Sequence, residues 1–561
     1  MHLRSVLPVA EWLPQYQRDY LVDDFVAGAT LAAYAIPVSL AYASLAGLPP
    51  EAGMYCYLAG GVGYALLGTS RHLAIGPTSA ISLVLGVSLA GIADGDTSRT
   101  AALASLVALA TAGVFLLAWV FKLSVLVNFI SESILIGFKA GAALTIATTQ
   151  LPKLLGVSGG GDSFFERVWL LLQQLDSANW LTVAFGMAAL IILVAGGVIA
   201  PRWPIALLVL LVSIGTVWFW GLDRQGLAVV GDIHAGLPGL RGVTDTVAKL
   251  DIDDGRQIAR IAAACFLLAY IESISAARTF ALQHKYEVNP RQELLGLGAA
   301  SALAGLFQGL PVAGGLSQTA VNERAGARTQ ISLLFCSAAI GCVLLFLTTY
   351  FRTLPDAVLA AVVLVAIQGL FDVRQVAHLW RASRQDFAAA AVAFAGVLLM
   401  GVLDGVMVAV LASILMLLAK VSCPNVAFLG RIPGTSRFSD LARHPTNERL
   451  PGTMIFRVQS SLLYFNVDYV LRVVREQAAR QSDLQRVICD LSNVPTVDIA
   501  GARLLLQLYE DFHARRVAFE VVEAHATVRE ILRAEGLDKL VGPITRLESL
   551  AGVLERETPP E

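Results

Sequence analysis

Two short apolar stretches of the sequence begin with glycine and hydroxyl-bearing residues, a composition that suits the binding of a small anion. One reads GPTSAISLVLG from Gly76, and the other reads GGLSQTAV from Gly314. If each stretch begins a helix, its first backbone N–H groups lack intrahelical partners and carry about half a positive charge from the helix dipole. The neighbouring hydroxyl groups belong to Thr78, Ser79, Ser317 and Thr319. Two such helix starts facing each other would bind an oxyanion without any cationic side chain.

Two ionisable residues in apolar surroundings are further functional candidates. Glu272 lies in CFLLAYIESISAARTF with no basic residue within one helical turn. Because burial favours the neutral form of a carboxyl group, Glu272 could carry a proton alongside an anion, or hold a cation when ionised. A structural carboxyl group bonded to a neighbouring helix is the alternative. Lys139, in ILIGFKAGAALTIATTQL, could add positive potential near the anion or extend along the apolar surface to its edge.

The composition of the chain is that of a membrane protein, so the elements that position these residues are expected to be membrane segments. Of 561 residues, 56% are apolar and 15% are charged, and the mean hydropathy is +0.66, which is far from the composition of a soluble domain. The net charge of -2 argues against a nucleic-acid partner. The N-terminal residues show no signal-peptide cleavage site, so the first apolar segment is expected to remain. The six cysteines lack metal-ligand spacing and are interpreted as packing residues, and we expect no metal ion and no cofactor.

Apolar runs of up to about 20 residues predict fourteen membrane segments in two sets of seven. The first set lies near 24–44, 52–69, 77–90, 99–120, 124–150, 180–199 and 203–221, and the second near 258–282, 291–310, 316–325, 329–350, 354–371, 385–404 and 405–420. The third segment of each set is abnormally short and contains one of the two stretches above. An odd number per set orients the halves oppositely, and matching interrupted segments indicate a transport site near the membrane midplane. Helix kinks that serve only packing are the alternative.

Charged residues in the connections predict the orientation of the segments. With the N-terminus in the cytoplasm, the short inner connections carry Arg71, Lys122, Arg202, Lys285, Arg291, Arg324, Arg328, Arg374, Arg381 and Arg384. The outer connections are acid-rich, as at Asp94 and Asp96. We therefore expect a multi-pass protein of the inner (plasma) membrane with cytoplasmic N- and C-termini. The predicted parts are a cytoplasmic N-terminus (1–23), a first transmembrane repeat (24–222), an extracytoplasmic connection (223–257) and a second transmembrane repeat (258–420).

The composition changes after the last apolar segment. Residues 421–449 are rich in Pro, Gly, Arg and Asn and are predicted to form a linker. The stretches TMIFRV, SLLYFNV, RVICDLS and VAFEVVEA have the β-branched and aromatic content of strands. Amphipathic patterns predict helices over 467–481, 501–515 and 526–535. Residues 450–555 are therefore expected to form a small cytoplasmic α/β domain.

Long stretches of the chain resemble the sulfate permease (SulP) family of anion transporters. They are DFVAGATLAAYAIPVSLAYASLAGLPPEAGMY (24–55), YALLGTSRHLAIGPTSAISL (64–83), NPRQELLGLGAASALAGLFQGLPVAGGLSQTAVNERAGARTQIS (289–332) and GRIPGTSRFSD (430–440). The soluble part resembles the STAS domain of these transporters through SLLYFNVDYV and VICDLSNVPTVDIAGARLLLQL. The resemblance covers almost the whole chain.

The resemblance implies an α-helical polytopic membrane protein followed by a small α/β STAS domain. Its fourteen transmembrane segments would form two inverted repeats of seven, divided into a core domain and a gate domain. The anion would bind between the starts of segments 3 and 10, and movement of the core against the gate would give alternating access. The positions that match the binding site of the family are Tyr42, Thr78, Ser79, Gly315, Leu316, Ser317 and Gln318.

Departures from the family pattern affect the expected anion site. Val38 stands where many members have Gln, and Gln318 stands where many have Arg. Without a fixed cation, the site would depend more on helix dipoles and on a co-transported cation. Glu272 is followed one turn later by Ala276, where sodium-coupled members have Asp followed by Thr. This difference favours a coupled proton over sodium.

The loop at residues 498–501 bears on the role of the soluble domain. STAS relatives that act as phosphorylation switches carry Asp-Ser-Ser/Thr-Gly there, whereas this chain has DIAG. Because no hydroxyl group is available for phosphorylation, the domain is expected to form a homodimer or partner interface. The same absence counts against the alternative of a membrane receptor that signals through its STAS domain.

Together these features predict a secondary active transporter of inorganic oxyanions, with sulfate uptake by proton symport as the first choice. Its expected partners are a small inorganic anion, a proton and the lipid bilayer, without nucleic acid. A bicarbonate or C4-dicarboxylate transporter, or a chloride/anion exchanger, is the alternative, because hydroxyl and amide groups accept any small oxyanion. Nucleobase permeases share the architecture but normally lack the soluble domain. An enzyme is not expected, since no nucleophile with an adjacent base and no phosphate-binding glycine loop stands out.

Overall fold

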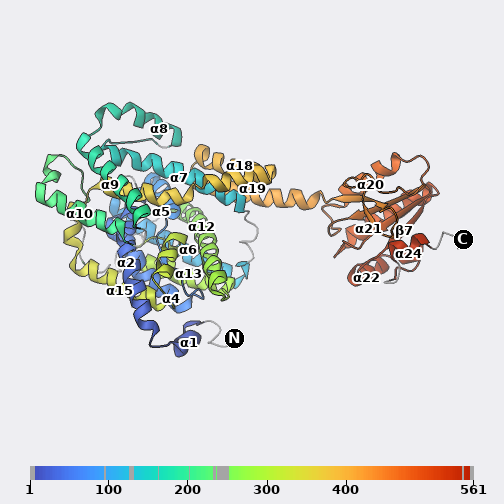
Figure 1. The fold of residues 1–561 in the computed structure, drawn as a ribbon, viewed down its shortest axis with the longest axis horizontal. Coiled ribbons are helices and arrows are strands. Elements are labelled where there is room, and N and C mark those ends of the chain that lie inside the picture. Colours follow the sequence, from blue (N-terminus) through green and yellow to red (C-terminus); the bar gives the residue numbers. More distant parts are fainter. Residues whose placement is uncertain are drawn as a thin grey trace. The chain divides into compact units, whose positions relative to one another are not determined.

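The computed structural model forms two compact units, Met1–Ser413 and Ile414–Glu561. It describes residues 7–93, 96–124, 132–161, 163–200, 203–231, 236, 252–545 and 549–555. Figure 1 shows the first unit as a bundle of helices and the second as a sheet with flanking helices. The boundary between the units lies within α19 (Val402–Ser422), the last long apolar helix.

The helices of the first unit follow the predicted segments. In the first half they are α1 (Val9–Trp12), α2 (Tyr20–Leu45), α3 (Pro50–Tyr55), α4 (Gly61–Leu67), α5 (Ser79–Ala93), α6 (Thr97–Val120), α7 (Glu132–Leu155), α8 (Phe164–Gln173), α9 (Trp180–Ile199) and α10 (Ile205–Trp220), with the π-helical turn η3 (Cys56–Gly60) between α3 and α4. In the second half they are α12 (Ile252–His284), α13 (Pro290–Leu306), α14 (Leu316–Arg324), α15 (Ile331–Phe346), α16 (Asp356–Ile367), α17 (Val373–Ala382), α18 (Arg384–Met400) and α19. Each predicted segment coincides with at least one of these helices, while the number that cross a membrane stays a prediction.

Several helices have the length and composition of membrane spans. Among the residues that the structure describes, α2, α6, α7, α9 and α12 are long and apolar enough to cross a bilayer. Shorter apolar helices lie at Ser79–Ala90, Ile205–Trp220, Ile331–Phe346, Asp356–Ile367 and Val410–Ser422. Ile192, Val198 and Trp218 on α9 and α10 are exposed apolar side chains of the kind that contact lipid.

Helix packing in the first unit is reciprocal between the two halves. The first segment of each half packs against the fourth segment of the other half, as α2 with α15 and α12 with α6. The fifth segment of each half packs against the sixth of the other, as α7 with α18 and α16 with α9. Two structurally equivalent halves produce this pattern, which agrees with the predicted repeats. It separates a core group (α2–α6 and α12–α15) from a gate group (α7, α9, α10, α16, α18 and α19).

A short antiparallel bridge joins the two halves inside the core group. It consists of β1 (Ile75–Gly76) and β2 (Ala313–Gly314), with Ile75 opposite Gly314 and Gly76 opposite Ala313. Close packing requires glycine at two of these positions. A Cβ atom on Gly76 would lie 2.3 Å from the ring of Tyr57, and one on Gly314 would lie 2.5 Å from the side chain of Leu73. Because β1 precedes α5 and β2 precedes α14, the two short helices begin beside the same bridge.

The second unit is an α/β domain built on a five-stranded sheet with the order β4-β3-β5-β6-β7. The strands are β3 (Val426–Arg431), β4 (Phe438–Asp440), β5 (Thr453–Val458), β6 (Arg486–Asp490) and β7 (Ala518–Val522), and the helices are α20 (Val467–Ala479), α21 (Ile499–Ala514), α22 (Ala526–Ala534), α23 (Asp538–Val541) and α24 (Leu550–Glu555). β5, β6 and β7 are parallel, while β3 is antiparallel to β4 and β5. Alternate residues of β5 enter different cores, since Phe456 packs with Leu505 of α21 and Ile455 with Val553 of α24.

Two segments of this domain differ from their prediction. Residues 421–449, predicted as a linker, contain β3 and β4, because Pro433 and Gly434 occupy the turn between these strands and Pro424 precedes them. SLLYFNV, predicted as a strand, makes only an isolated bridge between Leu462 and Val497. There the side chain of Asn466 accepts a hydrogen bond from Leu463 N at 3.0 Å and donates one to the Ser461 carbonyl at 2.9 Å, which stabilises a turn into α20.

Candidate functional site

Both short helices of the core group begin without a capping side chain. Gly315 is the N-cap residue of α14, and no side chain of the described residues caps this helix. Thr78 precedes α5, and its buried Oγ1 has no hydrogen-bond partner among the described residues. The first N–H groups of a helix need partners from outside the helix. Because both helices begin beside the β1–β2 bridge, their positive dipole ends lie close together.

Tyrosine side chains of α2 connect the two helix starts. Tyr42 is a neighbour of Ser79 at the start of α5, and Tyr34 is a neighbour of Ser317 at the start of α14. Tyr34 also lies close enough for an electrostatic interaction with Tyr42, which is about two turns further along α2. The structure therefore places Tyr42 beside Ser79 and places Tyr34, which the sequence analysis did not select, between Tyr42 and Ser317. The only sequence signal for Tyr34 is its spacing from Tyr42, which places both hydroxyl groups on similar faces of one helix.

Glu272 of α12 lies beside the start of α5. Its polar neighbours are Thr78 and Lys139, and its carboxyl group also lies close enough to Tyr42 for an electrostatic interaction. Its Oε2 atom is inaccessible to solvent and has no hydrogen-bond partner among the described residues. An ionised carboxylate in such surroundings is costly, so this group is stabilised by a proton, by a bound cation or by the neighbouring Lys139. We call Tyr42, Thr78, Ser79, Glu272 and Ser317 the central site.

The central site is covered on one side and accessible on the other. Its members on α2 and α5 are buried, whereas Ser317 on α14 is exposed. On α12, exposed side chains continue from Glu272 toward the C-terminal end of the helix at Ser275, Thr279 and Leu282. The exposed side chains nearest the central site therefore extend toward the C-terminal end of α12.

Two predicted residues of α14 contact the protein framework. Gln318 accepts a hydrogen bond at Oε1 from the Tyr57 hydroxyl group, and its Nε2 donates to the carbonyl of Ala313 at 2.9 Å. Thr319 accepts a hydrogen bond from Ala74 N at 3.2 Å. These contacts hold α14 to β2 and to the residues before β1. Gly315 and Leu316, the other two predicted residues, form the start of α14 itself.

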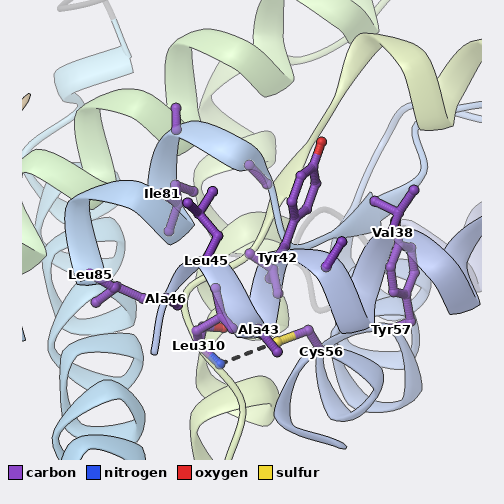
Figure 2. Packing of buried hydrophobic residues seen from close by; sticks show 14 of the residues in the cluster. Val38, Tyr42, Ala43, Leu45, Ala46, Cys56, Tyr57, Ile81, Leu85 and Leu310 are labelled. Carbon is purple, nitrogen blue, oxygen red and sulfur yellow. Dashed lines mark hydrogen bonds between the residues drawn. The ribbon is translucent and has the colours of Figure 1, made fainter. Parts of the chain in front are cut away.

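Further polar contacts fix the bridge between the halves. Ser273, next to Glu272, accepts a hydrogen bond from Gly314 N at 2.7 Å. Asn322 of α14 donates to the carbonyl of His72 at 3.0 Å. Cys56 of η3 accepts a hydrogen bond from Leu310 N at 3.2 Å, a contact drawn in Figure 2 with the ring of Tyr42 extending away from it. Sequence reasoning missed Ser273 and Asn322, because single polar residues carry no signal for a partner on another segment.

A titratable cluster lies at the C-terminal ends of α12 and α14. The rings of His72 and His284 stack with their centroids 4.3 Å apart, and His284 Nε2 lies 2.8 Å from Glu323 Oε1. His72 Nδ1 also lies 3.2 Å from the hydroxyl oxygen of Tyr286. Burial, with a smaller contribution from the neighbouring His284, lowers the pKa of His72 to about 4. His72 is therefore neutral at neutral pH.

The STAS-like unit has its own polar framework. Asp490 at the end of β6 is fully buried and receives Nε and Nη2 of Arg457 on β5 at 2.8 and 2.6 Å. Asp498 caps α21, because its carboxylate accepts hydrogen bonds from Gly501 N and Tyr464 N, both at 2.8 Å. Residues 498–501 therefore form an ordinary helix start.

Comparison with known proteins places both units. Residues 21–393 match the model of the Sulfate permease family, and residues 444–550 match that of the STAS domain. A protein of Mycobacterium tuberculosis named as a probable sulfate transporter is 34% identical over 540 residues, which cover 95% of this chain and 96% of that protein. High affinity sulfate transporter 1 of Stylosanthes hamata is 31% identical over 568 residues, which cover 96% of this chain and 84% of that protein.

Solved structures share the fold. The murine Solute Carrier 26 family member A9 anion transporter, in its inward-facing state, matches with a TM-score of 0.87 at 22% identity, over 99% of this chain and 94% of that chain. The transmembrane domain of the cyanobacterium bicarbonate transporter BicA matches with a TM-score of 0.61 at 22% identity, over 71% of this chain and 98% of that chain. The resemblance read from the sequence is thereby confirmed, and the chain belongs to the sulfate permease family of membrane anion transporters and carries a C-terminal STAS domain.

Proposed function

We propose that this protein is a secondary active transporter that takes up sulfate by symport with a proton. The observation that supports it is the pairing of two uncapped helix starts through the β1–β2 bridge. Together these starts offer about one positive charge from their dipoles. The anion would bind between them, next to the hydroxyl groups of Tyr42, Thr78, Ser79 and Ser317. The backbone at Gly315 and Leu316 would form the other wall of the site.

The choice of sulfate follows from the relatives, and the choice of a proton follows from Glu272. Curated relatives that cover almost the whole chain are named sulfate transporters. An ionised Glu272 in the central site would repel a divalent anion, whereas a protonated Glu272 would not. A proton and the anion would therefore favour each other's binding, which is the thermodynamic requirement of symport. Sodium is the less favoured partner, because Ala276 offers no oxygen one turn after Glu272.

Transport would proceed by movement of the core group against the gate group. Polar contacts between the groups include the hydrogen bond from Lys153 Nζ on α7 to Ser44 Oγ on α2 at 2.7 Å and the ion pair of Arg260 on α12 with Asp404 on α19 at 3.0 Å. We propose that the termini lie in the cytoplasm of a cell with this protein in its plasma membrane. The accessible side of the central site would then face the cytoplasm, and breaking the Lys153–Ser44 contact would accompany opening to the outside.

The experiment that tests this proposal is uptake of labelled sulfate by purified protein in proteoliposomes. Accumulation should increase when the pH is made lower outside than inside, and it should saturate with sulfate concentration. Competition by unlabelled bicarbonate, a C4-dicarboxylate and chloride identifies the cargo. A lack of sulfate accumulation, with uptake of one of these competitors in its place, would assign the alternative anion transporter or exchanger.

The STAS domain is proposed to form a homodimer interface. Its Asp498 cap is intact, and Ile499 and Ala500 carry no hydroxyl group that a kinase could modify. The mass of the detergent-solubilised full chain should therefore be that of two copies. A monomer that transports sulfate at the normal rate would contradict this part of the proposal. A receptor function predicts a lost cellular response but unchanged sulfate uptake when the protein is removed.

A further inference from the structure

Tyr57 of η3 lies outside the central site. It contacts β1, which precedes α5, and it contacts α14 itself. Its ring packs directly on Gly76 of β1, where a Cβ atom would come within 2.3 Å of it. Its hydroxyl group donates a hydrogen bond to Gln318 Oε1 on α14. Tyr57 is 2% exposed and belongs to the large hydrophobic core that Figure 2 shows in part. One rigid side chain therefore touches the approach to α5 and the first turn of α14.

Gln318 transmits this contact to β2. Its Nε2 donates to the Ala313 carbonyl at 2.9 Å, and the amide folds back over Gly315, where a Cβ atom would lie 3.2 Å from Nε2. The hydroxyl proton of Tyr57 requires an acceptor, so it selects the carbonyl end of the amide and leaves the NH2 end for Ala313. Ala313 in turn pairs with Gly76 across the bridge. The network thus closes a loop through both strands.

We propose that Tyr57 is a positioning residue for anion binding, and that it acts through Gln318 on the start of α14. The inference rests on the proposed anion site between the two helix starts. Because Gln318 is uncharged and its amide is engaged with the framework, the first turn of α14 acts on an anion through its backbone N–H groups. The strength of those donors depends on their direction. The Tyr57–Gln318 contact holds the turn from Ala313 to Gly315 and thereby sets that direction.

Removal of the hydroxyl group should weaken anion binding more than it alters the transport rate. In Tyr57→Phe the ring still covers Gly76, but Gln318 Oε1 becomes a buried acceptor without a partner, and the amide is free to turn. The KM for labelled sulfate should rise about fivefold or more, with a maximal rate within about twofold of wild type. Gln318→Met removes the amide and should raise the KM similarly. Combining both substitutions should add nothing further, since they interrupt one contact.

Tyr64→Phe is the matched control. Tyr64 is also fully buried on the neighbouring helix α4, and its hydroxyl group donates to Glu293 Oε2 at 2.8 Å. This variant should lose thermal stability yet keep the wild-type KM for sulfate, which separates positioning from a general loss of packing. If Tyr57→Phe does not fold, the KM of Gln318→Met alone decides between a positioning role and a general loss of packing.

Several results would overturn the inference while the proposed function stands. They are saturable sulfate uptake by wild type with an unchanged KM in Tyr57→Phe or Gln318→Met, an equal KM increase in Tyr64→Phe, or additive effects in the double variant. Wild-type protein that neither accumulates sulfate nor exchanges bicarbonate or chloride would contradict the proposed function and, with it, the role of Tyr57.

Discussion

Gly76 and Ala313 lie opposite each other in an antiparallel bridge, although they belong to different halves of the transmembrane unit. Gly76 precedes α5, which begins beside the unpartnered hydroxyl group of Thr78. Ala313 precedes α14, whose start has no capping side chain among the described residues. The bridge therefore brings together two positive dipole ends that neither half could bring together alone. This arrangement supports an anion site whose charge comes from the backbone.

Glu272→Gln should uncouple sulfate uptake from the proton gradient. The amide has nearly the shape of a protonated carboxyl group but cannot release a proton, so the imposed pH difference no longer drives accumulation. Uptake in proteoliposomes at equal and unequal pH measures this. Glu323→Gln is the control. Glu323 lies in the last turn of α14, where it pairs with His284 of α12, so this variant should leave the gradient dependence intact. Retained gradient dependence in Glu272→Gln would rule out Glu272 as the coupling group.

Gly76→Ala should abolish sulfate uptake. The added methyl group would lie 2.3 Å from the Tyr57 ring, so either the ring or the β1 backbone must move and the bridge to Ala313 is lost. Gly113→Ala on α6 is the control, since a Cβ atom there meets nothing within 4 Å. That variant should transport normally, with stability unchanged or slightly increased, because Ala favours helix over Gly. Normal uptake by Gly76→Ala would mean that the bridge is dispensable.

Asp24→Asn should destabilise the core group. Asp24 is fully buried on α2, and its carboxylate accepts hydrogen bonds from Arg328 N at 2.7 Å and from Thr329 N and Oγ1 at 3.0 and 2.7 Å, at the start of α15. The loss of charged acceptors at a helix N-terminus should lower the free energy of unfolding by about 1–3 kcal/mol. Thermal unfolding in detergent measures it.

Asp23→Asn provides the comparison for Asp24. The Asp23 side chain is 44% exposed and pairs with Arg328 Nε at 3.1 Å, so its loss should cost less than about 1 kcal/mol. Equal melting temperatures for the two variants would show that Asp24 does not hold α15 to α2.

His72→Gln should make the protein less sensitive to acid. The pKa of His72 is lowered from 6.5 to about 4 in the folded protein. As the pH falls from 7 toward 4, the unfolded chain binds a proton at this residue while the folded protein does not, so the free energy of unfolding decreases. The substitution removes this contribution, and the melting temperature should fall less between pH 7 and pH 5 than in wild type. His378→Gln, at an exposed position on α17, should show the same dependence of melting temperature on pH as wild type. The same dependence in His72→Gln would contradict the role of His72 in acid sensitivity.

Local composition accounts for much of what could be predicted. Long apolar runs predict helices, and the Gly-Pro and Gly-Gly interruptions mark the two short ones, because these features act within a single segment. The strands β3 and β4 escaped prediction because residues typical of turns surround them, and β4 has only three residues. Tyr34 and Tyr57 lie in apolar runs, and apart from the spacing of Tyr34 from Tyr42 no local signal distinguishes them. Their contacts depend on partners at Ser317 and Gln318.

The sequence by itself determined the membrane class, the helical segments and the two interrupted helices, since hydropathy and chain punctuation are properties of contiguous residues. Only the tertiary structure decided which groups meet. The β1–β2 register, the contact of Tyr57 with Gln318 and the position of Glu272 beside Thr78 join segments from opposite halves. Such contacts depend on the packing of distant helices against one another, which no local pattern records.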